Sequence, residues 1–137
     1  MSAKVQDLPK KHRLKGKKLI SELFRSGQQI FVFPFKLIYL PLDFSTSDPQ
    51  GFLFGTSVPK KKFKKAVDRN RIKRLIREAY RLNKPGLHSG QTVNSQDYAL
   101  MYIYVGNDNP DLKFLIKRIR KLHTALIAKI NQENNAI

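Results

Sequence analysis

The segment from Lys60 to Lys84 constrains this chain more than any other part of it. It holds twelve lysines and arginines against two acids, and so supplies about +10 of the formal net charge of +17 carried by the 137 residues. Its second half is amphipathic when projected at about 100° per residue. One arc is polar and mostly cationic: Arg69, Asn70, Lys73, Arg74, Arg77 and Arg81. The opposite arc is apolar: Ile72, Leu75, Ile76, Ala79, Tyr80 and Leu82.

This pattern predicts a helix that packs one face on a core and presents guanidinium groups to an anion. Phosphate backbone is the natural partner, because each neutralised phosphate releases condensed counterions. A sequence pI near 10.3 on so short a chain also favours a nucleic acid. An anionic membrane is the rival, but it usually requires exposed large apolar side chains on an amphipathic helix or a lipid anchor, and the sequence indicates neither.

Length and composition bound the remaining possibilities. A chain of this length favours one domain, and 41% hydrophobic residues suffice for an ordinary core. The absence of cysteine excludes disulfides, thiol catalysis and thiolate metal sites, which fits a reducing cytoplasm, and we expect a cytoplasmic protein. No apolar run reaches the roughly 18 residues of a membrane span, so we expect no membrane association.

Periodicity predicts the element order α-β-β-β-α-β-α. We expect a short helix over 17–26, strands over 28–42 with a break at Pro34, a strand over 52–58, the basic helix ending at 84–86, a strand over 98–105 and a last helix capped by Asn109. The last strand follows a helix, so it can pair in parallel with a neighbour. With the helices covering one face of a small sheet, the fold class is an α+β sandwich.

The chain divides into three parts by composition. Residues 1–18 form a basic arm that we expect to be flexible when free and to order on RNA. Residues 19–131 form the single RNA-binding domain, and residues 132–137 form a tail that we expect to fray.

No catalytic constellation can be assembled from the side chains. The ten acids lie mostly in loops or at helix starts, and no close acid pair lies on a predicted strand, as a two-metal nuclease requires. The three histidines are scattered over the arm, a loop and the last helix, where His123 is expected at the boundary of the core. No glycine-rich phosphate loop is present. We therefore predict no catalytic and no metal-ligating residues on this chain.

The residues around the basic helix closely resemble the signature of the bacterial ribonuclease P protein subunit. That signature is a strand, a pair of lysines, a short loop and then Arg-Asn-Arg-x-Lys-Arg-x-x-Arg on a helix. The six polar positions on the helix are matched without a gap by Arg69, Asn70, Arg71, Lys73, Arg74 and Arg77, and Lys60 and Lys61 match the pair of lysines. The resemblance extends over most of the chain, and it implies a four-stranded sheet with a left-handed β-α-β crossover, a topology shared with a domain of a small-subunit ribosomal protein.

The resemblance also implies a function. Ribonuclease P removes the 5′ leader from precursor tRNA, and in bacteria the catalyst is an RNA that coordinates Mg²⁺. The implied partners are this RNA and precursor tRNA, with no protein partner required. The eight matched residues would contact the catalytic RNA, since arginine can bind phosphate oxygens in pairs. Asn70 either adds a hydrogen bond or caps the start of the helix.

The family's second surface is a cleft between the first helix and the sheet, which holds the single-stranded leader. Phe24 and Tyr39 occupy the matching positions, and exposed aromatics beside a basic rim suit single strands. Two departures from the family pattern stand out. Ile20 replaces a further aromatic of the first helix, and Phe63 lies in a lysine-rich loop, where it either packs beneath the loop or touches RNA.

Three other functions compete with this interpretation. A non-catalytic RNA-binding protein, such as a ribosomal protein or an RNA chaperone, would bind RNA and process nothing. A protein-only nuclease is disfavoured by the missing acid cluster, and a DNA-binding protein by the absence of a helix-turn-helix pattern.

Overall fold

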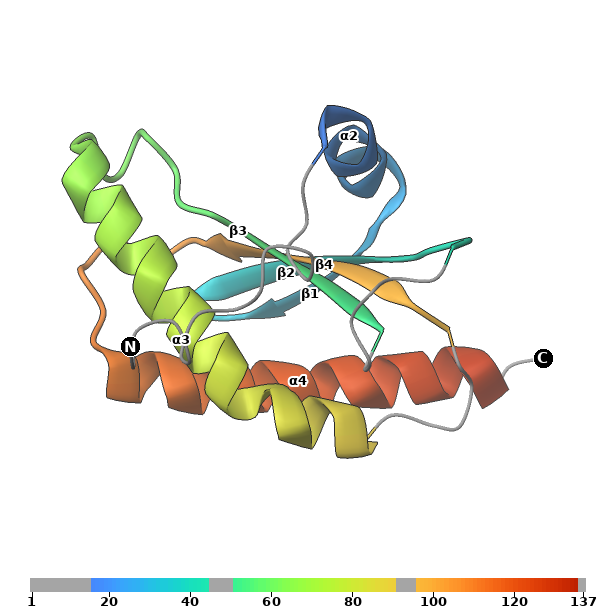
Figure 1. Cartoon of the computed structure of the whole chain (residues 1–137). Coiled ribbons are helices and arrows are strands. Elements are labelled where there is room, and N and C mark those ends of the chain that lie inside the picture. The colour runs from blue at the N-terminus through green and yellow to red at the C-terminus, as the bar shows by residue number, and fades with distance from the viewer. Residues whose placement is uncertain (1–15, 45–50, 91–95, 136–137) are drawn as a thin grey trace, which may run out of the picture.

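The computed structural model describes residues 16–44, 51–90 and 96–135. Its elements follow the expected order and are shown in Figure 1. They are α2 (Lys17–Ser26), β1 (Gln28–Val32), β2 (Phe35–Pro41), β3 (Phe52–Ser57), α3 (Ala66–Gly90), β4 (Tyr98–Tyr104) and α4 (Leu112–Asn135). The α+β class is confirmed, whereas the expected arm lies outside the described residues except for its last residues, which already begin α2.

The four strands form one mixed sheet in the order β1-β2-β4-β3. β1 and β2 form an antiparallel hairpin around Pro34, in which Val32 lies opposite Phe35. β4 pairs antiparallel with β2 and parallel with β3. The parallel pair is connected through α3, so the basic helix is the crossover of a β-α-β unit, as the resemblance implied.

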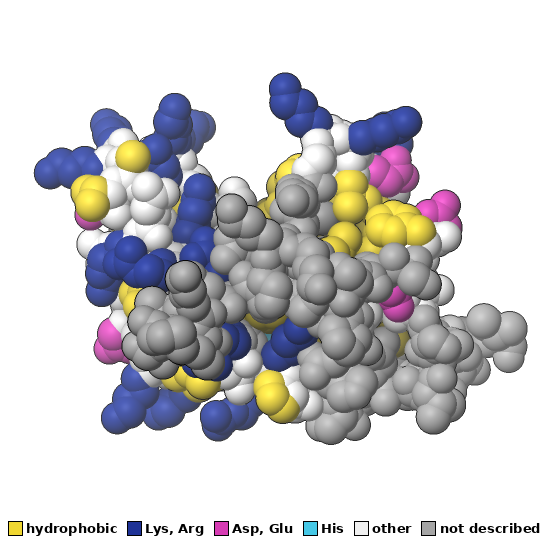
Figure 2. All heavy atoms as spheres, in the orientation of Figure 1, with side chains coloured by type: hydrophobic (Ala, Val, Ile, Leu, Met, Phe, Trp, Pro, Cys, Tyr) yellow, Lys and Arg dark blue, Asp and Glu magenta, His cyan; other side chains and the backbone are white. Residues whose placement is uncertain are grey.

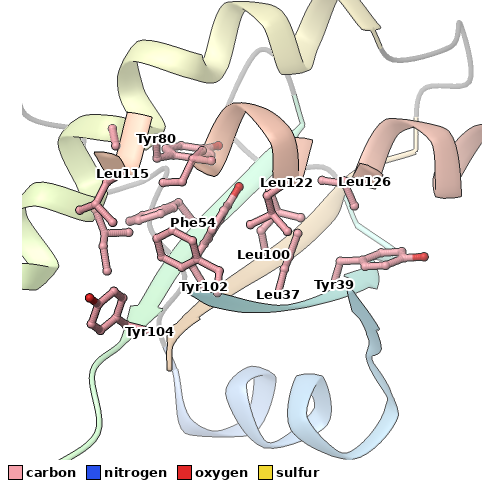
Figure 3. Close-up of a cluster of buried hydrophobic side chains, with 14 of the residues drawn as sticks. Leu37, Tyr39, Phe54, Tyr80, Leu100, Tyr102, Tyr104, Leu115, Leu122 and Leu126 are labelled. Carbon is pink, nitrogen blue, oxygen red and sulfur yellow. The ribbon is translucent and has the colours of Figure 1, made fainter. Parts of the chain in front are cut away.

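The helices cover both faces of the sheet, and not one face as the sequence led us to expect. α3 and α4 pack against the larger cluster, which includes Leu37, Tyr39, Leu100 and Tyr102 (Figure 3). α2 lies on the other face, over a smaller cluster built around Leu23. Successive residues of a strand point to opposite faces, so each strand supplies side chains to both clusters.

Gly27 shows why α2 turns sharply into β1. Its amide donates to the Leu23 carbonyl over 2.8 Å and ends the helix. A Cβ atom at this position would lie 2.4 Å from the Ile38 side chain, so the chain reverses where only glycine fits against the sheet. The stop expected at the end of this helix is confirmed.

Two helix boundaries differ from the expected ones. α3 continues through Pro85 to Gly90, because Leu87 extends the apolar stripe into the core, where it is 1% exposed. α4 begins at Leu112, and its N-cap is Asp111, whose Oδ1 accepts a hydrogen bond from the Phe114 amide over 2.8 Å. The expected cap, Asn109, lies before this turn.

α4 also continues beyond the limit that we expected for the ordered domain. Residues 132–135, expected in a frayed tail, belong to the helix. Within this segment Glu133 accepts a hydrogen bond from the hydroxyl of Tyr39. The end of the helix is therefore tied to the sheet by a contact that no local pattern indicates.

Candidate nucleic-acid interface

The loop between β3 and α3 is held on the core by Phe63. This side chain is 7% exposed, and its ring centroid lies 6.0 Å from that of Tyr104. The Phe63 amide also donates to the Pro59 carbonyl over 3.2 Å. Of the two roles open to Phe63, packing beneath the loop is therefore the one that the fold uses. The lysines around it point outward as a consequence.

Arg69 secures the other side of the loop. Its Nη1 atom donates to the carbonyls of Phe63 and Lys64, over 2.8 and 2.9 Å. Arg71 turns in a different direction, and its Nη1 lies 3.4 Å from the Pro110 carbonyl, before α4. The two arginines that flank Asn70 therefore brace different neighbours of α3. Asn70 is exposed and is the fifth residue of the helix, so it does not cap its start.

The cations of the loop and of α3 together form the basic surface, defined here as the lysines of residues 60–65 and the cations of α3 from Arg69 to Arg77. Figure 2 shows these dark blue side chains gathered over the loop and the first half of α3. Lys60, Lys61, Arg71 and Arg74 are exposed, while Lys73 and Arg77 are half-buried. Lys62 is also exposed, and its Nζ donates to the Val105 carbonyl over 2.7 Å. The arrangement can neutralise several phosphates at once.

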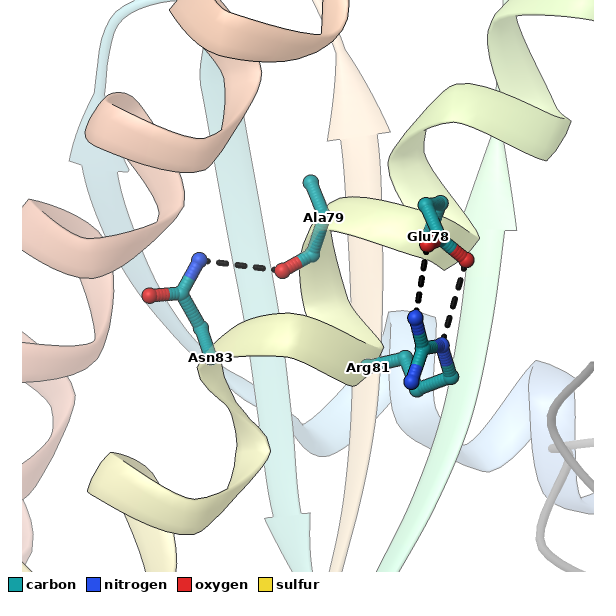
Figure 4. Close-up of polar contacts among 4 residues, drawn as sticks. All are labelled: Glu78, Ala79, Arg81 and Asn83. Carbon is teal, nitrogen blue, oxygen red and sulfur yellow. Dashed lines mark hydrogen bonds and ion pairs between the residues drawn. The ribbon is translucent and has the colours of Figure 1, made fainter. Parts of the chain in front are cut away.

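The basic surface ends before the C-terminal half of α3. There Arg81 forms a bidentate ion pair with Glu78, with its Nη2 atom 2.7 Å from Oε2 (Figure 4). Asn83 is buried and donates to the Ala79 carbonyl over 2.9 Å and to the Ile116 carbonyl of α4 over 3.1 Å. This half of α3 therefore serves helix packing, and the charge of Arg81 is offset by Glu78.

The structure does not bring Phe24 and Tyr39 together. Phe24 lies on α2 and is 48% exposed. Tyr39 is fully buried on the opposite face of the sheet, beneath α4, where its hydroxyl donates to Glu133 over 3.1 Å (Figure 3). Burial, and then the contact with Glu133, raise the pKa of the Tyr39 hydroxyl far above its usual value. In this fold Tyr39 is a core residue, and its placement in a cleft beside Phe24 needs correction.

A different set of residues lines the sheet face beside α2. Phe31 lies opposite Lys36, Lys36 lies opposite Ile103, and Ser57 lies beside Ile103 in the register. Paired residues of neighbouring strands share a face, and Ile103 packs with the cluster under α2. These paired residues form a row that crosses the sheet from Phe31, which is 63% exposed, to Ser57 at the end of β3. The lysine loop, residues 60–65, begins just after this strand.

Alternation in β2 contained the signal that we missed. Lys36, Ile38 and Leu40 alternate with Phe35, Leu37 and Tyr39, so period two places Tyr39 on the face opposite Lys36. A basic residue marks the wetter face of such a strand. Figure 2 shows the surface hollowed between α2 and the start of α3, above this face.

His123 is a core residue and not a boundary residue. It is 4% exposed, and its Nε2 shares a hydrogen bond of 2.6 Å with the hydroxyl of Tyr102, whose direction is set by the tautomer of the ring. Burial raises the pKa of Tyr102 well above its usual value, so that hydroxyl keeps its proton. Burial lowers the pKa of His123 to about 4, so the ring is neutral at pH 7. His12 lies outside the described residues.

Two properties of the described residues bear on metals and membranes. Within 16–44, 51–90 and 96–135, no three histidine, cysteine, aspartate or glutamate side chains are grouped closely enough to hold a metal ion. In the same ranges, none of the helices is both long and apolar enough to span a membrane.

The chain is similar to several known proteins. The family model described as Ribonuclease P matches residues 8–126. The "Ribonuclease P protein component" of Porphyromonas gingivalis is 32% identical over 114 residues, which cover 83% of this chain and 82% of the relative. The protein of the same name from Chlorobaculum tepidum is 44% identical over 80 residues, 56% of this chain and 51% of that one.

Solved structures show the same fold. The ribonuclease P protein of Thermotoga maritima superposes with a TM-score of 0.62 at 19% identity, covering 80% of this chain and 93% of that chain. The Staphylococcus aureus protein superposes with a TM-score of 0.59 at 21% identity, covering 88% and 94%. At these identities the likeness concerns the arrangement of helices and strands.

Proposed function

The chain belongs to the bacterial ribonuclease P protein family, and we propose that its basic surface binds the RNA subunit of that enzyme while its α2 face binds the 5′ leader of precursor tRNA. As a ribonuclease P protein component it takes part in tRNA processing, within an endoribonuclease complex. We propose that the RNA subunit hydrolyses the phosphodiester bond and binds most of the Mg²⁺, while the protein binds RNA. We also propose that the protein acts in the cytoplasm and needs no further protein partner.

One observation carries the proposal. The basic surface adjoins the row of Phe31, Lys36 and Ile103, because the row ends at Ser57 of β3 and the lysine loop begins three residues later. Cations that neutralise phosphates thus stand beside exposed aromatics that can stack on unpaired bases. The protein can hold a folded RNA and a single strand on neighbouring surfaces, which requires no catalytic side chain.

In the proposed leader site, Phe24 and Phe31 provide the stacking surfaces and Lys36 provides the charge. Phe24 and Phe31 are both about half exposed or more. Ile20 is half-buried in the cluster beneath α2, and contributes only an apolar contact. Tyr39 has no part in this site, because it is buried on the other face.

The test is cleavage of a leader-bearing precursor tRNA at low Mg²⁺ by purified protein, with and without the ribonuclease P RNA of the same organism. We expect cleavage at the mature 5′ end only when both are present. Arg74→Glu should weaken the assembly, whereas Arg120→Glu is a control with the same change of charge at an exposed position of α4.

Three outcomes would contradict the proposal. Failure of the protein to stimulate the RNA would favour a non-catalytic RNA-binding protein, and cleavage by the protein alone would indicate an active site on the chain. An equal effect of Arg74→Glu and Arg120→Glu would show that total charge matters and that the basic surface has no specific role.

A further inference from the structure

A second pair of exposed aromatics lies on the far side of the protein from α2. Phe33 is at the turn between β1 and β2 and is 51% exposed, and Phe114 is in the first turn of α4 and is 40% exposed. Both line a cavity of about 300 Å³, together with Pro34, Tyr104 and the turn that precedes α4. This volume is at the lower end of the range for small-molecule pockets, roughly 300 to 1,000 Å³.

Cations from three elements converge on the rim of this pocket. Arg118 of α4 donates through Nε to the Phe33 carbonyl over 2.6 Å. Lys62 of the lysine loop donates to the Val105 carbonyl, and Arg71 of α3 to the Pro110 carbonyl. Because Lys62 and Arg71 also belong to the basic surface, the pocket is continuous with it around the end of the sheet.

The pocket interior differs in charge from its rim. Asp108 and Asp111 line it, and Asp111 is already occupied in capping α4. Carboxylates and carbonyls in the pocket disfavour a phosphate there, but they can accept hydrogen bonds from the N–H groups on the edge of a base. Lys117 and Lys121 follow Phe114 at helical spacings of three and seven, so they continue the cationic flank along α4, and both are exposed.

We propose that this pocket binds one unpaired nucleotide of an RNA, with the base against Phe33 and Phe114 and the adjoining phosphates on Arg118, Lys117 and Lys121. Charge complementarity favours RNA over a protein partner, because the flank of α4 outside the pocket is cationic. The inference rests on the proposed RNA-binding role, but it uses a surface distinct from the α2 face. It predicts that RNA wraps from α3 around to the start of α4.

Main-chain hydrogen bonds tie Phe33 and Phe114 to their neighbours. Arg118 donates to the Phe33 carbonyl, and the Asp111 carboxylate accepts from the Phe114 amide. Neither contact involves an aromatic side chain. The double variant Phe33→Ala, Phe114→Ala should therefore melt like the parent. Phe44→Ala is the matched control, because Phe44 is 50% exposed but follows the opposite end of β2.

The experiment measures the affinity of the full-length variants for the cognate ribonuclease P RNA over a range of salt concentrations. We expect the double variant to bind roughly fivefold to a hundredfold more weakly, because each stacked base is lost with its aromatic partner, and to keep the parental salt slope. Lys117→Ala should lower that slope by about one. Phe44→Ala should bind like the parent.

Arg74→Glu separates failure of this inference from failure of the proposed function. If Arg74→Glu weakens binding and the double variant does not, the pocket binds no RNA, and its two aromatics remain available to a protein partner. If the parent itself does not bind the RNA, the proposed function and this inference fail together.

Discussion

The hydroxyl of Tyr39 donates a hydrogen bond to Oε2 of Glu133 over 3.1 Å, and so joins β2 to the last turns of α4. The two residues are separated by 94 positions in the sequence. The contact ties residue 133, which lies beyond the expected end of the domain, to the sheet, and it holds in the core an aromatic side chain that the sequence made a candidate for stacking on RNA.

Tyr39→Phe should lower stability and leave leader binding unchanged. The substitution keeps the ring and removes one hydrogen bond, which costs about 1 kcal/mol and should lower the melting temperature by about 3 to 5 °C. Thermal denaturation and binding of leader-bearing precursor, measured on one preparation, check both parts. Weaker leader binding with parental stability would return Tyr39 to the RNA interface.

Phe31→Ala and Phe24→Ala should each weaken binding of the leader. We expect roughly a fivefold to a hundredfold loss of affinity for precursor tRNA with a leader, from lost stacking. Affinity for the same tRNA without its leader should not change. The ratio of the two dissociation constants is the measurement, and a ratio equal to that of the parent would exclude these side chains from the leader site.

Substitution by alanine should affect stability and RNA binding differently at Arg69 and at Arg74. Arg74 is exposed, so Arg74→Ala should lower the salt slope of RNA binding by about one without changing the melting temperature. Arg69 holds two loop carbonyls, so Arg69→Ala should lower the melting temperature as well as RNA affinity. Salt titrations combined with thermal melts distinguish them, and identical behaviour would contradict the bracing role of Arg69.

His123 should make the protein less stable as pH falls. Its pKa is about 4 in the folded protein and near 6.5 when unfolded. Between these values the unfolded chain binds a proton that the folded chain excludes. Stability therefore decreases as pH falls from about 6.5 to about 4, by about 3 kcal/mol at most, and is unaffected by this group above that range.

His123→Gln tests this dependence, because glutamine can still form a hydrogen bond with Tyr102 and does not titrate. Denaturant unfolding at several pH values between 4 and 7 should give a shallower pH profile for the variant. Since the substitution also alters packing, the slope is compared and not the absolute stability. Parallel profiles for parent and variant would contradict a buried neutral ring.

Local sequence patterns determined much of this protein. The element order, the start and end of α2, the amphipathic stripe of α3 and its family signature all follow from residue spacing, because helix and strand periods are properties of a short segment. The boundaries that were wrong, at Pro85 and Asn109, were those where a local stop signal met a tertiary contact or a better cap. Leu87 continues α3 because α4 covers it, and Asp111 starts α4 because its carboxylate reaches the Phe114 amide.

Tertiary structure alone decided which residues became available to a ligand. Alternation separates Tyr39 from Lys36, and the lysine marks the wetter face, but only the docking of α4 buries Tyr39 completely, and only the position of α2 leaves the face of Lys36 partly open. Likewise, the motif spacing places Arg69 and Arg71 on one helix, and only the folded chain directs one to the lysine loop and the other to the turn before α4. The physical reason is that the helix or strand periodicity of a segment assigns its side chains to one face or the other. The burial and the contacts of those side chains depend on segments that are distant in the sequence.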